Sequence, residues 1–173
     1  MIATAPLQTA SVRTSASRWQ GARTRLDRIA PGVAQAVLRA TLGAVLLPHG
    51  AQHMFGWFGG YGFTATVAWM TGTLGVPAPL AAAAIVLEVV APLALILGIA
   101  TRAAGLALAG FMTVAASTHA ANGFFMNWFG SRPAGVEGFE YHLLAVAMAL
   151  AVAAQGGGAW AIDRLFARMP PRA

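Results

Sequence analysis

Four apolar runs divide the chain, and each approaches the length that crosses a bilayer. They cover about residues 33–55, 79–100, 103–121 and 139–156. A helix of about 20 apolar residues spans the hydrocarbon core, which is roughly 30 Å thick. The pattern therefore predicts an all-α, polytopic membrane protein whose four spans form a four-helix bundle.

The segments between and beyond these runs complete the predicted organisation. Residues 56–76 are uncharged and rich in glycine, and their middle, residues 63–72, predicts a short interfacial helix between spans one and two. Residues 1–32 predict a flexible, Arg-rich cytoplasmic tail. Within it, apolar residues recur at helical spacing between arginines, which favours a short helix lying on the membrane surface. Residues 33–162 form the predicted transmembrane domain, and residues 163–173 a second cytoplasmic tail.

Composition supports a bilayer environment and excludes several kinds of chemistry. The chain is 58% hydrophobic and 9% charged, whereas soluble domains are roughly a quarter charged. Mean hydropathy is +0.66. The chain has no cysteine, so it cannot supply a thiol nucleophile, a disulfide or a Cys-ligated metal site by itself.

The placement of arginine predicts the orientation. All basic residues are Arg, and nine of the eleven lie before the first run, in the turn at residues 100–103, or after the last run. Cytoplasmic loops of membrane proteins carry such an excess, so we expect both termini to face the cytoplasm of a bacterial inner membrane. The same distribution suits anionic lipid headgroups rather than nucleic acid, despite a net charge of +6.

Ionisable side chains inside the apolar runs are the candidate functional residues. A charge at the bilayer centre costs roughly 2.5–3.5 kcal/mol on insertion scales, so such residues default to a functional hypothesis. In the predicted topology they gather between mid-depth and the outer leaflet. Glu140 and His142 lie about 200° apart on a helix, and we expect Glu140 to face the centre. The predicted small-molecule site consists of His49, His53, Glu88, His119, Asn122 and Glu140.

Three further interpretations of these polar residues stay open. Arg39 could form a structural ion pair with Glu88 or reach the inner headgroups, and we favour the pair. His49 and His53 have metal-ligand spacing but lack the glutamate of a zinc-protease helix, so we predict no metal site. A hydrogen-bonded polar core that only fixes the helix register is the structural alternative.

The two halves of the chain share a weakly similar sequence motif. A His-x-x-Gln stretch at residues 49–52 precedes Trp-Phe-Gly at 57–59, and a His-x-x-Asn stretch at 119–122 precedes Trp-Phe-Gly at 128–130. This similarity could mark two parallel repeats around an axis along the membrane normal, although chance is a rival explanation.

These residues resemble the DoxX family of small bacterial membrane proteins. The resemblance covers about residues 38–165 and rests on Arg39, Glu88, Glu140 and the stretches 48–60, 97–102 and 119–125. The family usually has Lys where this chain has His53. The resemblance implies four spans and a redox setting, since relatives include a subunit of a thiosulfate:quinone oxidoreductase and proteins associated with oxidative-stress defence.

Three functions remain in competition at this point. The first, which we favour, is a redox-associated accessory protein that binds a quinone or another small molecule, with haem or copper ranked below quinone as the cofactor. The second is a non-catalytic membrane scaffold that recruits an oxidoreductase. The third is a small-molecule transporter. Whether the chain is an enzyme is left open, and its small-residue helix faces could also allow a homo-oligomer.

Overall fold

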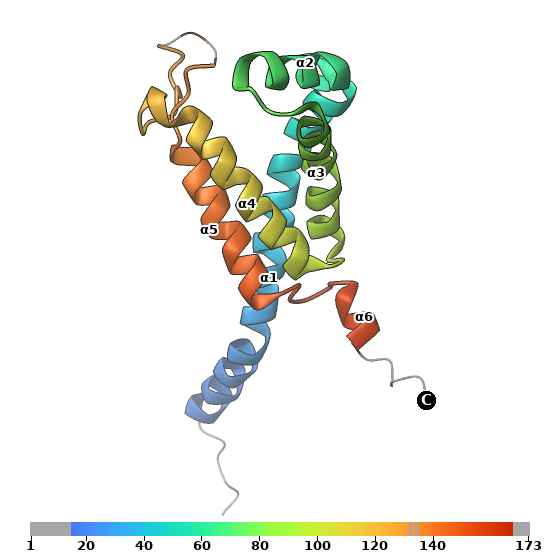
Figure 1. Cartoon of the computed structure of the whole chain (residues 1–173). Coiled ribbons are helices and arrows are strands. Elements are labelled where there is room, and N and C mark those ends of the chain that lie inside the picture. Colours follow the sequence, from blue (N-terminus) through green and yellow to red (C-terminus); the bar gives the residue numbers. More distant parts are fainter. Residues whose placement is uncertain (1–14, 132, 134, 168–173) are drawn as a thin grey trace, which may run out of the picture.

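The described part of the protein is entirely helical. The computed structural model describes residues 15–131, 133 and 135–167, and no strand occurs among them. The long helices are α1 (Ser15–Phe55), α3 (Ala78–Leu97), α4 (Thr101–His119) and α5 (Glu140–Gln155) (Figure 1). The shorter elements are α2 (Gly62–Leu74), α6 (Asp163–Ala167) and the 3-10 turns Trp57–Gly59 and Ala120–Asn122.

The four long helices pack around one apolar core. Each contributes a side chain that is almost fully buried there: Leu42 from α1, Leu95 from α3, Leu108 from α4 and Val152 from α5. α1 packs most extensively with α3, and α4 with α5, so the core is built from two helix pairs. We call the end that carries α2 and the loop 123–139 the apical end, and the end where α3 and α5 finish the basal end (Figure 1).

Two glycines allow the backbones within each pair to approach closely. A Cβ atom at Gly50 of α1 would overlap the carbonyl oxygen of Glu88 on α3. A Cβ atom at Gly105 of α4 would lie only 2.9 Å from the carbonyl oxygen of Ala149 on α5. Small residues at such crossings are typical of helices that associate in a membrane, where close van der Waals packing replaces the hydrophobic effect.

Three helical segments are long and apolar enough to cross a membrane. They are Arg23–Phe55, Ala78–Leu97 and Thr101–Asn122, and the shorter apolar helix Glu140–Gln155 accompanies them. Large apolar side chains such as Val90, Leu106 and Leu144 point away from the core, as lipid-facing residues do. The first three predicted spans are therefore confirmed as apolar helices of spanning length, while the crossing by α5 stays a prediction.

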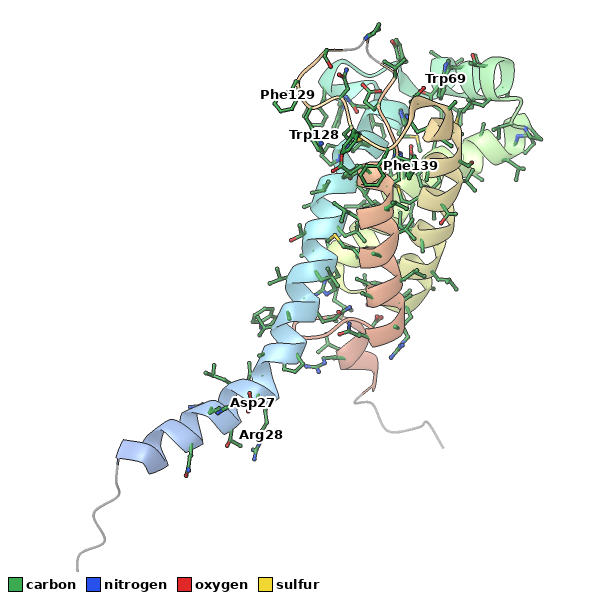
Figure 2. The ribbon with its side chains drawn as sticks, turned by 90° about the vertical axis from the view of Figure 1, so that its left-hand side faces the viewer. Asp27, Arg28, Trp69, Trp128, Phe129 and Phe139 are labelled. Atoms are coloured by element: carbon green, nitrogen blue, oxygen red, sulfur yellow. The ribbon has the colours of Figure 1, made fainter. Side chains whose placement is uncertain are left out.

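α2 lies across the apical end, where the sequence predicted a short helix (Figure 1). It packs against both α1 and α3, and its one buried residue, Thr66, faces inward. Trp69 of the same helix is exposed at this end (Figure 2). The interfacial position of α2 relative to a bilayer stays a prediction.

α1 begins at Ser15, far before the apolar run that starts at residue 33, and it continues through Pro31 without a break. Its first part projects beyond the basal end, with Asp27 and Arg28 on its surface (Figure 2). Arg23, Arg25 and Arg28 are all exposed. Residues 15–32, where the sequence predicted a tail with a possible short surface helix, are helical and continuous with the first span. Residues 1–14 and 168–173 lie outside the described part.

Arg39 is buried at the basal end and does not form the expected ion pair with Glu88. Its Nη1 donates to the carbonyl oxygens of Leu95 and Ile96 at 2.5 and 2.6 Å, and its Nε donates to that of Gly157 at 2.8 Å. The expected pair is wrong because Glu88 lies about two turns nearer the apical end of α3 than these acceptors. Arg39 instead donates hydrogen bonds to carbonyl groups at the C-terminus of α3, where the negative end of the helix dipole favours a positive charge.

Candidate ligand cavity

An apolar cavity with several polar side chains lies between the helices at the apical end. Its volume is about 460 Å³, which is within the usual range for small-molecule sites. All five helices from α1 to α5 contribute to its wall. The titratable or hydrogen-bonding side chains in the lining are His49, His53, Thr66, Trp69, Glu88, Thr118, His119, Glu137, Tyr141 and His142.

His53 and Glu88 form a short ion pair or shared-proton contact at the wall of this cavity. His53 Nδ1 and Glu88 Oε2 are 2.5 Å apart, and Glu88 is the less exposed partner, at 13% against 38%. Gly50 explains the contact, because the backbones of α1 and α3 nearly touch there and His53 follows one turn later. A contact this short places a hydrogen between the imidazole nitrogen and the carboxylate oxygen, so the two side chains form one hydrogen-bonded unit at the wall.

The other three histidines surround the same space. The rings of His119 and His142 lie with their centroids 4.7 Å apart and tilted by 32°. His49 faces Tyr141 with a centroid distance of 6.4 Å. His119 Nδ1 lies 2.9 Å from the carbonyl oxygen of Glu137, which can only accept, so Nδ1 carries a hydrogen and a neutral His119 has its acceptor at Nε2.

Three buried polar atoms in the cavity wall have no hydrogen-bond partner within the described part of the chain. They are Thr66 Oγ1 on α2 and, on α5, Tyr141 Oη and His142 Nδ1. A buried polar group left unpaired costs about 1–3 kcal/mol, and native proteins contain few of them. Their grouping around one cavity is the arrangement expected of a site whose hydrogen bonds are completed by a bound molecule.

Two of the predicted site residues lie elsewhere. Glu140 Oε2 accepts from the backbone N–H of Met126 at 3.2 Å and from Trp128 Nε1 at 3.3 Å. Asn122 Nδ2 donates to the carbonyl oxygen of Glu137 at 3.0 Å. Both side chains therefore order the loop 123–139 rather than line the cavity.

The expected orientation of Glu140 and His142 is wrong, since the structure reverses it. Glu140 is the first residue of α5, and its carboxylate turns to the N–H donors of the loop. His142, about 200° further round the helix, is buried and faces the cavity. The polar lining residues absent from the predicted site are thus Thr66, Trp69, Thr118, Glu137, Tyr141 and His142.

Four of the six predicted residues do meet: His49, His53, Glu88 and His119 all line the cavity. Among the described residues, no group of three or more His, Asp or Glu side chains is arranged to hold a metal ion. The cavity therefore combines apolar lining residues, hydrogen-bonding side chains and one imidazole–carboxylate pair.

Apolar helices of spanning length around a partly polar cavity define the class, an α-helical integral membrane protein. Residues 34–128, more than half of the chain, match the model of the DoxX family. The chain belongs to the DoxX family, which confirms the resemblance seen in its sequence. No curated protein and no solved structure matches the chain.

Proposed function

We propose that this protein binds a small lipophilic molecule with polar edges in the apical cavity, and that a quinone is its ligand class. The observation that carries the proposal is the set of three buried polar atoms, on Thr66, Tyr141 and His142, that have no partner within the described part of the chain and belong to residues lining a largely apolar cavity. A planar ring between two carbonyl oxygens suits such a wall, because hydroxyl groups donate to the carbonyls while apolar side chains cover the ring.

The His53–Glu88 pair fits the chemistry of that ligand class. Reduction of a quinone to a quinol takes up two protons together with two electrons. A short imidazole–carboxylate contact at the cavity wall can deliver or accept one of these protons, whereas the electrons must come from a partner or a second substrate. The protein then acts as a redox-associated accessory component, for example in oxidative-stress or quinone-detoxification pathways.

The proposed setting is the bacterial inner membrane, with four spans and both termini in the cytoplasm. The basal end carries Arg102 and Arg164, and the projecting part of α1 adds three exposed arginines. Trp69, Trp128 and Phe129 are exposed at the opposite end, as the aromatic belt of an outer interface would be (Figure 2). In this orientation the cavity opens toward the periplasmic half of the bilayer.

Binding of a short-chain 1,4-benzoquinone to the purified protein tests the proposal. Quinones quench indole fluorescence, and Trp69 lies in the cavity lining. We expect saturable quenching that His49→Ala and Glu88→Gln abolish or weaken strongly. Glu140→Gln is the matched control, because Glu140 orders the loop and does not line the cavity. Equal affinity in the wild type and in both cavity variants contradicts the proposal.

A scaffold that recruits a soluble oxidoreductase is the second candidate, and one observation favours it. The projecting part of α1 packs against no other helix in Figure 1 and exposes Arg23, Arg25 and Arg28 together with Leu26 and Ile29. Deletion of residues 1–30 separates the two functions. If the protein is a scaffold, the shortened chain no longer co-purifies with the oxidoreductase, although its quinone binding is unchanged. If the protein is an accessory component that needs only the cavity, the shortened chain keeps the quinone-dependent protection that the full chain provides.

A further inference from the structure

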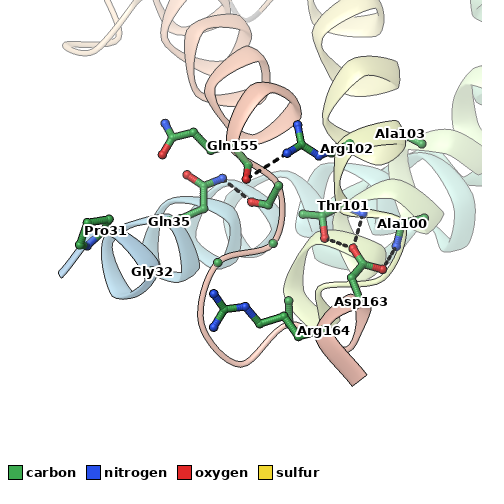
Figure 3. A pocket seen from close by; sticks show the side chains of 14 residues that line it. Pro31, Gly32, Gln35, Ala100, Thr101, Arg102, Ala103, Gln155, Asp163 and Arg164 are labelled. Carbon is green, nitrogen blue, oxygen red and sulfur yellow. Dashed lines mark hydrogen bonds between the residues drawn. The ribbon is translucent and has the colours of Figure 1, made fainter. Parts of the chain in front are cut away.

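A second cavity lies at the basal end, on the opposite side of the molecule from the proposed ligand site. Its volume is about 730 Å³, and it is enclosed by α1, the start of α4, the end of α5 and the segment 156–164 (Figure 3). Its polar lining includes Gln35, Thr101, Arg102, Asp163 and Arg164. None of these residues takes part in the apical cavity, so the basal cavity requires a separate explanation.

Arg102 brings a positive charge to this cavity that no carboxylate neutralises. Its Nη1 donates to the carbonyl oxygens of Ala153 and Ala154 at 3.0 and 2.5 Å, and its Nη2 donates to that of Gln155 at 3.5 Å. These acceptors are neutral groups at the C-terminus of α5. A guanidinium has five N–H groups, so these three bonds leave two N–H groups for a further acceptor.

Arg164 supplies a second positive charge from α6. Its side chain is exposed and lines the cavity, and no hydrogen bond or ion pair from it occurs within the part of the chain that is described. Arg39 adds a third charge behind the wall, because it donates to the carbonyl oxygens of Gly157 and Ala159. Two guanidinium groups therefore line the cavity, and a third is hydrogen-bonded to the backbone behind its wall.

Asp163 is the one carboxylate in the lining, and the protein already satisfies it. It accepts from the backbone N–H groups of Ala100 and Thr101 at 2.8 and 2.9 Å, and from Thr101 Oγ1 at 2.5 Å (Figure 3). This carboxylate fixes the turn between α3 and α4 and pairs with neither Arg102 nor Arg164. The excess of positive charge at the cavity thus stays available to an anion from outside the chain.

We propose that the basal cavity binds a phosphate group through Arg102 and Arg164. Guanidinium groups bind phosphate with paired N–H donors, and a cavity concentrates them better than an open surface does. The cavity lies where the apolar parts of α3, α4 and α5 end, which is the depth of lipid headgroups. An anionic phospholipid or a soluble phosphate compound presents the same chemistry, and the experiment distinguishes these two sources.

Two measurements on the full chain in a neutral detergent test the site. Native mass spectrometry compares the binding of phosphatidylglycerol and phosphatidylcholine, added in equal amounts. Thermal unfolding compares the midpoint in inorganic phosphate with the midpoint in chloride at the same ionic strength. Each basic residue near an anionic headgroup contributes about 1 kcal/mol, so we expect Arg164→Gln to reduce phosphatidylglycerol binding about fivefold. The exposed side chain of Arg164 makes no hydrogen bond or ion pair with the described residues, and its backbone hydrogen bond to Ala161 is kept in the variant, so this variant should fold normally.

Arg28→Gln is the matched control, because Arg28 is an exposed arginine of α1 outside the cavity. Selective retention of phosphatidylglycerol that depends on Arg164 and not on Arg28 supports the site with a lipid occupant. Stabilisation by inorganic phosphate alone, with the same dependence, supports it with a soluble occupant. Equal losses in the two variants, or no anion preference in either measurement, overturn the proposal.

Discussion

Replacing Tyr141 by phenylalanine should change stability and ligand affinity in opposite directions. In the ligand-free protein the hydroxyl of Tyr141 is buried in the cavity wall without a hydrogen-bond partner. Such a group costs about 1–3 kcal/mol, and phenylalanine removes it while keeping the ring and its contact with His49. We therefore expect the free energy of unfolding of ligand-free Tyr141→Phe to rise by about 1 kcal/mol.

The same substitution should weaken quinone binding, because the bound ligand would lose one hydrogen bond. A net contribution of about 0.5–1.5 kcal/mol corresponds to a loss of about 2- to 12-fold in affinity. Most single substitutions that reduce binding also reduce stability or leave it unchanged. A gain in stability together with a loss in affinity is therefore the mark of a polar group that serves a ligand rather than the fold.

Two measurements on one preparation check this prediction. Thermal unfolding in neutral detergent, followed by circular dichroism, should show a midpoint about 2–4 °C higher for ligand-free Tyr141→Phe. Fluorescence quenching by a short-chain benzoquinone gives the affinity. Tyr61→Phe is the control, since Tyr61 is the only other tyrosine and is 85% exposed. A variant that is less stable than the wild type and binds quinone equally well refutes the reasoning.

Three further substitutions test the packing and the basal end. Gly50→Ala should abolish the folded state or greatly lower its yield, because its methyl group overlaps the backbone of α3, whereas Gly72→Ala, in open space on α2, should be tolerated. Arg39→Met should lower the free energy of unfolding by about 3 kcal/mol or more, since buried carbonyl groups lose charged donors. Asp163→Asn should remove a loss of stability that the wild type shows on acidification below about pH 4, as measured by unfolding midpoints between about pH 2 and 5.

The sign of the acid effect follows from the surroundings of Asp163, which lies outside the membrane-spanning segments. Burial alone would raise the pKa of this carboxyl, but hydrogen bonds from Thr101 and Ala100 and the positive charge of Arg39 hold the pKa below its ordinary value of 3.8. A depressed carboxyl pKa stabilises the folded state fully above the ordinary value and loses that contribution as the pH falls through the lowered one.

Apolar run length was sufficient to predict the long helices, because a continuous apolar stretch of about 20 residues has few other stable forms. It was not sufficient to predict where α1 begins. Residues 15–32 lack a continuous apolar stretch, yet they extend the helix of the first span N-terminally past Pro31. A helix that is already formed can be extended one residue at a time, so a polar sequence can join it without forming a nucleus of its own.

In the candidate site, too, residue spacing was enough to predict the positions of some side chains, whereas packing determined the positions of others. Topology and helical phase were enough to bring His49, His53, Glu88 and His119 to one region. Phase also showed that only one of Glu140 and His142 could face inward, but the choice depended on backbone N–H donors in a loop with no regular pattern.

The partners of Arg39 were equally hidden from the sequence, since carbonyl oxygens belong to every residue and none is marked in a sequence. Two of the arginines at the basal end nevertheless share one role, which is to bind carbonyl groups at the C-terminus of a helix. Arg39 of α1 binds carbonyl groups where α3 ends, and Arg102 of α4 binds them where α5 ends. In each case the arginine is on the first helix of a pair and holds the end of the second.

This shared role is not evidence for parallel repeats, because Arg39 and Arg102 lie 63 positions apart, whereas the similar motifs at residues 49–59 and 119–130 lie 70 or 71 positions apart. In both pairs a glycine on the first helix, Gly50 or Gly105, lets the second approach. The pairs differ at the apical end, where α3 offers the carboxylate of Glu88 to His53 and α5 offers the ring of His142 to His119. Two helix pairs with unlike polar groups thus give the cavity one wall with an imidazole–carboxylate contact and another with two adjacent imidazole rings, and a ligand with two distinguishable edges would bind it in one orientation.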